Sequence, residues 1–430
     1  MIGVLRQAAV YRAGVSGRRP RVPTDAAKLE ARARKAMARQ AFAYVAGGAG
    51  TGATIRANRE GFDRWRIVPR MLRDVSGRDS GVELFGRRLP SPFLLSPVGV
   101  LEMAHEDADL GVARAAAAEG VPMIFSNQAS RTMEECAAAL GDGPRWFQLY
   151  WSTSNELVES FVRRAEACGC EAIVVTLDTT LLGWRTHDLD LAYLPFLRGK
   201  GIAQYTSDPV FKRIIATDPA QLGPDERPRP TPAALRTLVQ LTRAYPDRFL
   251  SGLRSGHARA AVQTFTRIYS RPSLSWDDLP FLRERTKLPI LLKGILHPDD
   301  AARAVDEGMD GVIVSNHGGR QVDGATSTIE ALPAIARAVD DRVPIVLDSG
   351  VRSGADAFKA LALGATAVGI GRPYAYALAI AGEAGVRELL QNLKADFDLT
   401  MGLSGCTSVG EIGPEALTSA TEPAGLPTPR

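Results

Sequence analysis

The histidine at position 317 is the best candidate for a general base in this sequence. It is one of only five histidines and stands in the glycine-bordered run Ser315-Asn316-His317-Gly318-Gly319-Arg320, directly after a short apolar segment. A single histidine is more often structural, but Asp178 follows another apolar segment and is expected at a neighbouring position. A carboxylate beside an imidazole fixes its tautomer and stabilises the imidazolium. The pattern therefore predicts that His317 takes a proton, with Asp178 as its partner.

Arginines near these positions are suited to bind anions. Arg185 follows Asp178 after a turn, and Arg320 follows His317 in the same loop. A guanidinium binds both oxygens of a carboxylate, so the two arginines and a tyrosine hydroxyl predict a clamp for a carboxylic acid. Two further segments share a glycine-plus-arginine pattern that favours a phosphate cradle over glycine caps and surface arginines: Asp348–Arg352 and Gly369–Arg372.

Short apolar segments alternate with helical patterns and predict the fold that positions these residues. They are continuously apolar, as in parallel strands covered on both faces. Eight strand-then-helix units predict an α/β fold, a closed (β/α)8 TIM barrel whose active site lies at the carboxyl ends of the strands. The expected strands are 92–98, 121–126, 145–150, 172–177, 289–293, 311–315, 343–347 and 366–370. The helices expected between them are 109–119, 132–140, 156–167, 299–306, 329–339 and 354–363.

Four other regions complete the expected organisation. Residues 1–24 are expected to be an N-terminal arm, and 25–413 one barrel domain that begins with a helical and hairpin cap: a helix over 25–44 and a hairpin within 68–90 that closes the barrel bottom. A stretch of about 186–275 after the fourth strand is much longer than an ordinary connection. It is expected to be a lid insertion with a helix over 231–245, and residues 414–430 a flexible tail.

The composition excludes several classes of protein. The chain has 430 residues, 45% of them apolar and 23% charged, and a net charge of +4. No apolar stretch is long enough to span a bilayer, and no signal peptide or basic nucleic-acid patch is evident. Cys168-Gly-Cys170 has no second pair and no nearby histidines, so no metal site and no disulfide framework are expected. Residues 47–52 are glycine-rich, but they follow a helix and indicate a turn rather than a dinucleotide site. A cytoplasmic protein is expected.

With these residues in place, the chain resembles the family of FMN-dependent α-hydroxy acid oxidases and dehydrogenases. The resemblance runs from about Phe42 to Ile412, and its most specific element is the Ser315–Gln321 run. Lys293-Gly294, Asp348–Arg352, 359–365 and Gly371-Arg372-Pro373 follow in the family's order. Within the family the chain is most similar to the lactate 2-monooxygenases, on residues 44–48, 69–72, 183–185, 197–199 and 205–211.

The resemblance implies a role for each matching residue. His317 and Asp178 are implied as the catalytic pair, Arg185, Arg320 and Tyr44 as the carboxylate site, and Tyr150 as the contact of the substrate hydroxyl. Lys293 is implied to hold negative charge that develops on the reduced flavin. The residues implied to hold the isoalloxazine and ribityl parts of FMN are Pro97, Val98, Gly99, Ser126, Gln148, Thr176, Lys293 and Ser315. Those implied to hold the ribityl chain and phosphate are Asp348, Gly350, Arg352, Gly371 and Arg372.

The implied reaction is oxidation of an L-2-hydroxy acid to the 2-keto acid, with O2 as the acceptor. Three outcomes stay open: a monooxygenase that turns lactate into acetate, CO2 and water; an oxidase that releases keto acid and hydrogen peroxide; and a dehydrogenase that reduces a quinone or a protein. Retention of the five proton-transfer and carboxylate residues disfavours a non-catalytic barrel or an FMN-dependent isomerase. Gln128 stands where some oxidases carry an aromatic residue, which leaves the side-chain preference open. Kinship implies a homotetramer or homo-octamer.

Overall fold

A closed parallel barrel of eight strands forms the centre of the molecule, which confirms the predicted fold. The computed structural model describes residues 2–218, 231–245 and 256–420. Around the barrel the strands follow the order β10-β11-β4-β5-β6-β7-β8-β9. Their bounds are β4 (Phe93–Leu95), β5 (Met123–Phe125), β6 (Arg145–Leu149), β7 (Ile173–Thr176), β8 (Ile290–Ile295), β9 (Gly311–Val314), β10 (Ile345–Leu347) and β11 (Ala367–Ile370).

Each barrel strand falls on a predicted apolar segment, and most are shorter than the prediction by one to three residues at an end. Every residue of β7, β9 and β11 is buried, because helices cover one face and the barrel interior the other. The residues after the strands leave the ladder and turn toward the carboxyl-end rim. Where a strand ends earlier than predicted, the polar residues that follow it therefore lie outside the hydrogen bonds of the sheet and are available at the rim.

An antiparallel hairpin closes the amino-terminal end of the barrel, as predicted. It consists of β2 (Val82–Leu84) and β3 (Arg87–Leu89). Val82, Leu84 and Leu89 share one buried cluster with the side chains that fill the barrel interior, and the ring of Phe85 meets Trp146 edge-on at 5.6 Å. The interior is thus a packed core and not a channel.

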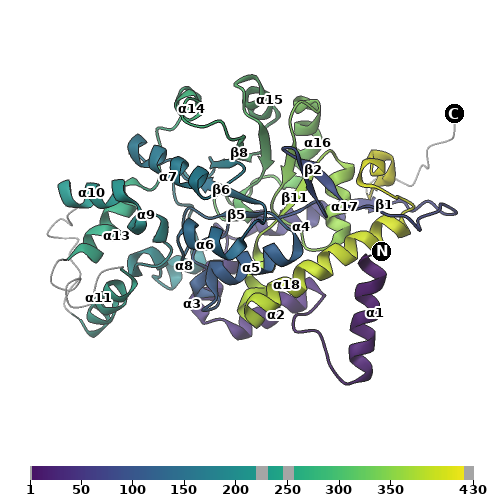
Figure 1. The fold of residues 1–430 in the computed structure, drawn as a ribbon, viewed down its shortest axis with the longest axis horizontal. Coiled ribbons are helices and arrows are strands. Elements are labelled where there is room, and N and C mark those ends of the chain that lie inside the picture. Colours follow the sequence, from purple (N-terminus) through teal and green to yellow (C-terminus); the bar gives the residue numbers. More distant parts are fainter. Residues whose placement is uncertain (1, 219–230, 246–255, 421–430) are drawn as a thin grey trace.

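Helices surround the barrel and connect its strands (Figure 1). The connecting helices agree with the predicted ranges to within one residue: α5 (Ala108–Glu119), α6 (Met133–Leu140), α7 (Asn155–Ala167), α15 (Pro298–Asp306), α16 (Thr328–Val339) and α17 (Gly354–Ala362). A short helix, α14 (Leu279–Arg283), precedes β8, and a long one, α18 (Arg372–Leu403), follows β11. Helix α18 contains non-helical residues at Ala381 and Gly382 and packs along α5.

The N-terminal region differs from the prediction in two ways. The expected arm contains a helix, α1 (Ile2–Val15), which projects from the body in Figure 1 and packs one side against α18. The single helix expected over 25–44 is two helices, α2 (Ala26–Ala36) and α3 (Arg39–Ala46), because Met37 and Ala38 are extended. After the glycine turn, α4 (Ala53–Asp63) begins at Gly52, whose φ is +75°.

The beginning of the predicted flexible tail is ordered. Residues 417–419 form β12 (Leu417–Ser419), which pairs antiparallel with β1 (Trp65–Ile67). The sequence prediction missed this pairing because each strand has only three residues and the partners are at least 350 positions apart. Residues 421–430 lie outside the described residues, and the division into arm, barrel domain and tail stays a prediction.

The described residues of the insertion, 186–218, 231–245 and 256–275, form a group of helices at one side of the barrel (Figure 1). They are α8 (Thr186–Asp190), η2 (Pro195–Arg198), α9 (Ala203–Ser207), α10 (Pro209–Thr217), α11 (Pro232–Ala244) and α13 (His257–Ile268). Helix α11 matches the predicted helix, with Thr231 as its N-cap. Tyr205 joins the group to α7, since the centre of its ring lies 4.8 Å from the ring centre of Phe265 and 5.1 Å from that of Phe161. Within the described ranges, no helix is both long and apolar enough to cross a bilayer.

Candidate active site

A cavity opens at the carboxyl ends of the barrel strands and contains most of the predicted site residues. It contains about 1170 Å³ of empty space, part of which is open to solvent. The predicted residues that line it are Tyr44, Pro97, Val98, Gly99, Ser126, Tyr150, Arg185, Lys293, His317, Arg320, Asp348, Gly350, Arg352, Gly371 and Arg372. Of the other predicted residues, Gln148, Asp178 and Ser315 form hydrogen bonds to this lining, and Thr176 accepts a hydrogen bond from Gln148.

The imidazole of His317 is paired with a buried carboxylate. Its Nδ1 lies 2.7 Å from Oδ1 of Asp178, and the Thr179 hydroxyl donates to the same oxygen at 3.0 Å. An ionised carboxylate only accepts hydrogen bonds, so Nδ1 carries the proton and Nε2 is left with a free lone pair. Burial lowers the pKa of His317, although Asp178 opposes this shift. The imidazole is therefore neutral at pH 7 and able to accept a proton.

The carboxylate of Asp178 stays ionised in this buried position. Burial would raise its pKa, but the nearby His317 and Lys293 outweigh that effect and hold the pKa below its ordinary value. The adjacent strand leaves room for this side chain only because residue 294 is glycine. A Cβ at Gly294 would lie 2.9 Å from Cβ of Asp178, and its φ of +110° disfavours other residues.

The loop that carries His317 has an unusual backbone. His317, Gly318 and Gly319 have φ values of 56°, 64° and 75°, a left-handed run that costs energy at the histidine. Hydrogen bonds hold this conformation: the Ser315 hydroxyl accepts from His317 N at 3.1 Å, and Ser349 accepts from Gly318 N at 2.9 Å. The two glycines of the signature thus allow the turn that directs His317 toward the cavity.

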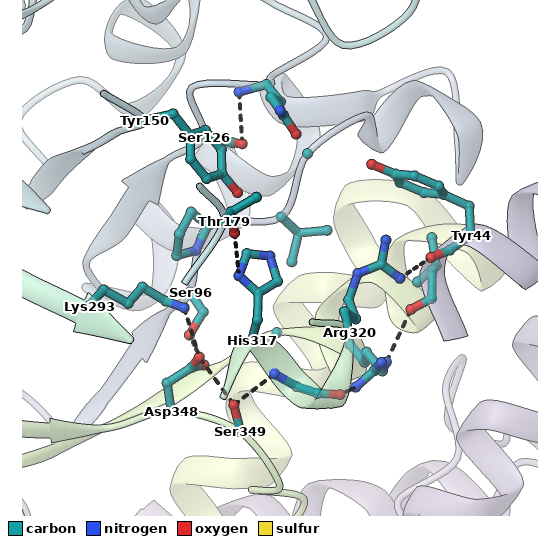
Figure 2. A pocket seen from close by; sticks show the side chains of 18 of the residues that line it. Tyr44, Ser96, Ser126, Tyr150, Thr179, Lys293, His317, Arg320, Asp348 and Ser349 are labelled. Atoms are coloured by element: carbon teal, nitrogen blue, oxygen red, sulfur yellow. Dashed lines mark hydrogen bonds and ion pairs between the residues drawn. The ribbon is translucent and has the colours of Figure 1, made fainter. Parts of the chain in front are cut away.

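Arg320, Tyr44 and Tyr150 face the same space as His317 (Figure 2). Arg185 also lines this cavity. Arg320 donates to the backbone carbonyls of Tyr44 and Gly47, the latter at 3.1 Å, and its guanidinium lies 4.8 Å from the centre of the Tyr44 ring. Burial and the neighbouring Arg185 lower the pKa of Arg320 to about 9. Burial raises the pKa of Tyr150, so its hydroxyl stays protonated.

Lys293 lies inside the rim in a buried hydrogen-bonded network. Its Nζ is 2.9 Å from Oγ of Ser315 and 3.1 Å from Oδ2 of Asp348. Ser96 also donates to Asp348, at 2.7 Å, and together these groups lower the pKa of Asp348 to about 2 against the effect of burial. Asp348 in turn keeps the pKa of Lys293 above its ordinary value despite burial. Lys293 thus presents a fixed positive charge to the cavity.

A chain of side-chain amides and hydroxyls supports the wall near β5, β6 and β7. Gln148 accepts from the Ser126 hydroxyl at 3.2 Å and donates to Thr176 at 3.0 Å. The backbone of Asn127 donates to the same amide oxygen at 3.3 Å. The side chains of Ser126, Gln148 and Thr176, all predicted from the sequence, are buried. The network fixes the direction of their donors and acceptors at the cavity wall.

The far end of the cavity fits an anion such as the phosphate of FMN. Arg352 and Arg372 both line it, and burial and the Arg372 charge lower the pKa of Arg352 to about 10. In the part of the chain that the structure describes, Arg185, Arg320, Arg352 and Arg372 form no ion pair with a carboxylate. Buried cations without a counter-charge are costly, so the cavity favours anionic ligands. A Cβ at Gly371 would point into open space, with only Val98 within 4 Å, which leaves room for a ligand there.

The sequence prediction missed several residues of this site. Ser96, Thr179 and Ser349 lie at strand ends beside predicted residues. Their positions in the sequence could therefore have identified them as site residues. Residues of the insertion that line the cavity belong to no motif, and only tertiary packing brings them there: Leu194, Phe196, Phe265, Thr266 and Tyr269. The four cysteines are free thiols, and Cys168 caps the end of α7.

Comparisons with known proteins identify the same family. The sequence model of FMN-dependent dehydrogenases matches residues 33–419. The chain is 41% identical over 368 residues to an L-lactate oxidase of Lysinibacillus sphaericus, covering 86% of each chain. It is 39% identical to an FMN-dependent alpha-hydroxy acid dehydrogenase of Penicillium citrinum, covering 98% of this chain and 97% of the relative. Among solved structures it is similar to mandelate oxidase, with a TM-score of 0.73, 36% identity and coverage of 93% and 98%.

The family match covers most of the chain, and the relatives match it over nearly their whole length. The residues present also fit the cofactor, because the cavity offers guanidinium groups that no described carboxylate neutralises and, at Gly371, open space beside them that a phosphate could occupy. The chain belongs to the FMN-dependent α-hydroxy acid oxidoreductases, and its cofactor is FMN.

Proposed function

We propose that this protein oxidises a small L-2-hydroxy acid, with L-lactate as the first candidate, to its 2-keto acid and uses O2 as the electron acceptor. The observation that carries the proposal is the convergence on one cavity of a neutral imidazole paired with Asp178 and of two guanidinium groups that pair with no carboxylate of the described residues. An acid with an α-hydroxyl group needs both features. The carboxylate requires the cations, and the hydroxyl group requires a base.

In this proposal the arginines bind and orient the substrate. Arg185 and Arg320 take the carboxylate, with Tyr44 beside them, and buried charge pairs of this kind are strong because water does not screen them. The hydroxyl group of Tyr150 donates a hydrogen bond to the hydroxyl oxygen of the substrate. The substrate is then held with its α-carbon toward the FMN site and its hydroxyl toward His317.

His317 acts as the base. Its Nε2 takes a proton from the bound acid, and Asp178, which accepts from Nδ1, stabilises the imidazolium that forms. FMN, when bound, accepts the two electrons that leave the α-carbon. The residues proposed to hold FMN are Pro97, Val98, Gly99, Ser126, Gln148, Thr176, Lys293, Ser315, Asp348, Gly350, Arg352, Gly371 and Arg372. The positive charge of Lys293 favours a reduced, negatively charged ring.

The fate of the keto acid depends on the insertion. Side chains from η2 and α13 line the cavity, and this supports retention of the product until hydrogen peroxide decarboxylates it in place. The balanced overall reaction is lactate + O2 → acetate + CO2 + H2O. A second candidate is an oxidase that releases pyruvate and H2O2, which the similarity to L-lactate oxidases favours.

Product analysis tests these proposals. The holoenzyme is incubated with L-lactate in air, and acetate, pyruvate and hydrogen peroxide are quantified. Acetate without peroxide supports the monooxygenase, whereas pyruvate with an equal amount of peroxide supports the oxidase. Lack of flavin reduction by any acid in a panel of 2-hydroxy acids would refute the proposed reaction. Kinship alone supports a homotetramer or homo-octamer, which light scattering measures directly.

A further inference from the structure

The side chain of Gln321 connects two loops of the site and uses its full hydrogen-bonding capacity. Its Nε2 donates to the backbone carbonyls of Asp178 at 2.6 Å and Leu181 at 2.8 Å. Its Oε1 accepts from Arg185 Nη2 at 2.9 Å and from Gly183 N at 3.3 Å. A carboxamide has two N–H donors and two acceptor lone pairs, and all of them point to the segment 178–185.

These bonds determine where the Arg185 guanidinium points. Its other polar contact is from Nε to the carbonyl of Arg320, at 3.3 Å. No carboxylate of the described residues pairs with it. Its direction therefore depends on the Gln321 amide and on one longer bond to the loop that carries Gln321.

The backbone around Gln321 is itself anchored on the opposite side. The carbonyl of Val322 accepts from Thr54 Oγ1 at 2.7 Å. Asp323 accepts from the backbone of Thr51 at 2.6 Å and of Ala53 at 2.7 Å. The segment 178–185 also lies tightly against this loop, because a Cβ at Gly183 would be 2.6 Å from the Arg320 carbonyl oxygen. Gln321 thus extends from a fixed base toward Arg185.

We propose that Gln321 is a positioning residue that aims the Arg185 guanidinium at the substrate carboxylate and holds the backbone of Asp178 in place. The inference rests on the proposed roles of Arg185 and Asp178. Gln321 does not line the cavity, so it acts through these residues and not on substrate or FMN. Its effect on binding is expected to exceed its effect on rate, because it bonds the Arg185 side chain directly but only the main chain of Asp178.

The test uses Gln321→Met, which keeps length and removes every hydrogen bond. Anaerobic stopped-flow reduction of the holoenzyme by L-lactate, or by the panel acid that reduces it fastest, yields the substrate Kd and the limiting rate. We expect the Kd to rise about tenfold, as for loss of one charge-assisted hydrogen bond, with a smaller fall in limiting rate and an unchanged FMN content. An unchanged Kd would overturn the inference.

A double-mutant cycle with Arg185→Lys separates positioning from a general structural effect. If Gln321 acts through Arg185, Gln321→Met changes the Kd little in the Arg185→Lys background, whereas fully additive effects contradict the inference. Gln391→Met is the matched control, since Gln391 is a partly buried glutamine that donates to Glu119 far from the cavity. It should leave the Kd unchanged, and a rise equal to that of Gln321→Met would contradict the assignment.

A shorter amide keeps the test decisive if the methionine variant does not fold. Gln321→Asn retains the carboxamide but reaches the 178–185 segment less well, so it should also raise the Kd. A wild-type Kd in Gln321→Asn would overturn the inference. Failure of the wild-type protein to be reduced by any acid of the panel would instead refute the proposed function, so the two failures are distinguishable.

Discussion

Replacing Asp178 with asparagine removes a negative charge 2.7 Å from the imidazole of His317 while nearly preserving the shape of the side chain. Asp178 is buried and ionised, so little solvent screens this charge. A hydrogen bond to a charged group contributes about 1.5–3 kcal/mol, and each 1.36 kcal/mol changes a rate about tenfold. The limiting rate of flavin reduction should therefore fall about 10- to 150-fold in Asp178→Asn.

The same substitution should shift the pH dependence in a defined direction. Reduction requires neutral His317, so the rate rises with pH through the pKa of this residue. Burial already places that pKa below its ordinary value, and Asp178 is the group that raises it. Without Asp178 the acid limb of the profile should move to still lower pH while the plateau falls.

Anaerobic stopped-flow bleaching of the holoenzyme between about pH 5 and 9 measures both quantities. Asp188→Asn is the matched control, because Asp188 is a buried carboxylate near Arg185 and Arg320 that makes no hydrogen bond to His317 among the described residues. It should leave the acid limb in place. A wild-type plateau in Asp178→Asn, or an acid limb at higher pH, would refute the assigned pairing.

Two further predictions concern the FMN phosphate and the Lys293–Asp348 pair. Arg352→Ala should raise the Kd for FMN at least about tenfold but leave riboflavin binding nearly unchanged, because Arg352 lines the proposed phosphate site and, among the described residues, its side chain hydrogen-bonds only the Val351 carbonyl. Fluorescence titration of the apoprotein measures both, and an equal loss for the two ligands would contradict the phosphate assignment. Asp348→Asn should lower the free energy of unfolding of the apoprotein by about 3–5 kcal/mol at pH 7, as for a broken buried ion pair. Since the pKa of Asp348 is lowered to about 2, its contribution to the free energy of unfolding is complete above about pH 4 and is lost as the pH falls toward 2. Denaturant unfolding should therefore show a smaller difference between wild type and Asp348→Asn at low pH, and a difference that stays constant with pH would contradict the pairing.

The barrel and the chemistry of its rim were predictable from the sequence because both depend on local patterns. Continuously apolar segments of strand length indicated a parallel sheet, and polar residues directly after them indicated one rim. His317 and Asp178 follow β9 and β7, with β8 between them, so the predicted pairing required the side chains to reach across one strand. The structure brings them to hydrogen-bonding distance.

The parts that sequence reasoning missed depend on tertiary contacts without a local signature. Phe196 and Phe265 reach the cavity from helices of the insertion, which pack through Tyr205 against α7. Nothing in their spacing distinguishes them from ordinary core residues. The β1–β12 pairing and the break between α2 and α3 are likewise decided by packing, which overrides the weak preferences of short segments.

A variant without the imidazole tests whether His317 takes the substrate proton. The absorbance of FMN in purified His317→Ala is followed after anaerobic mixing with the 2-hydroxy acid that reduces the wild-type protein fastest. We expect a yellow protein with normal FMN content whose reduction is slowed at least about a hundredfold. Bleaching at the wild-type rate would contradict it.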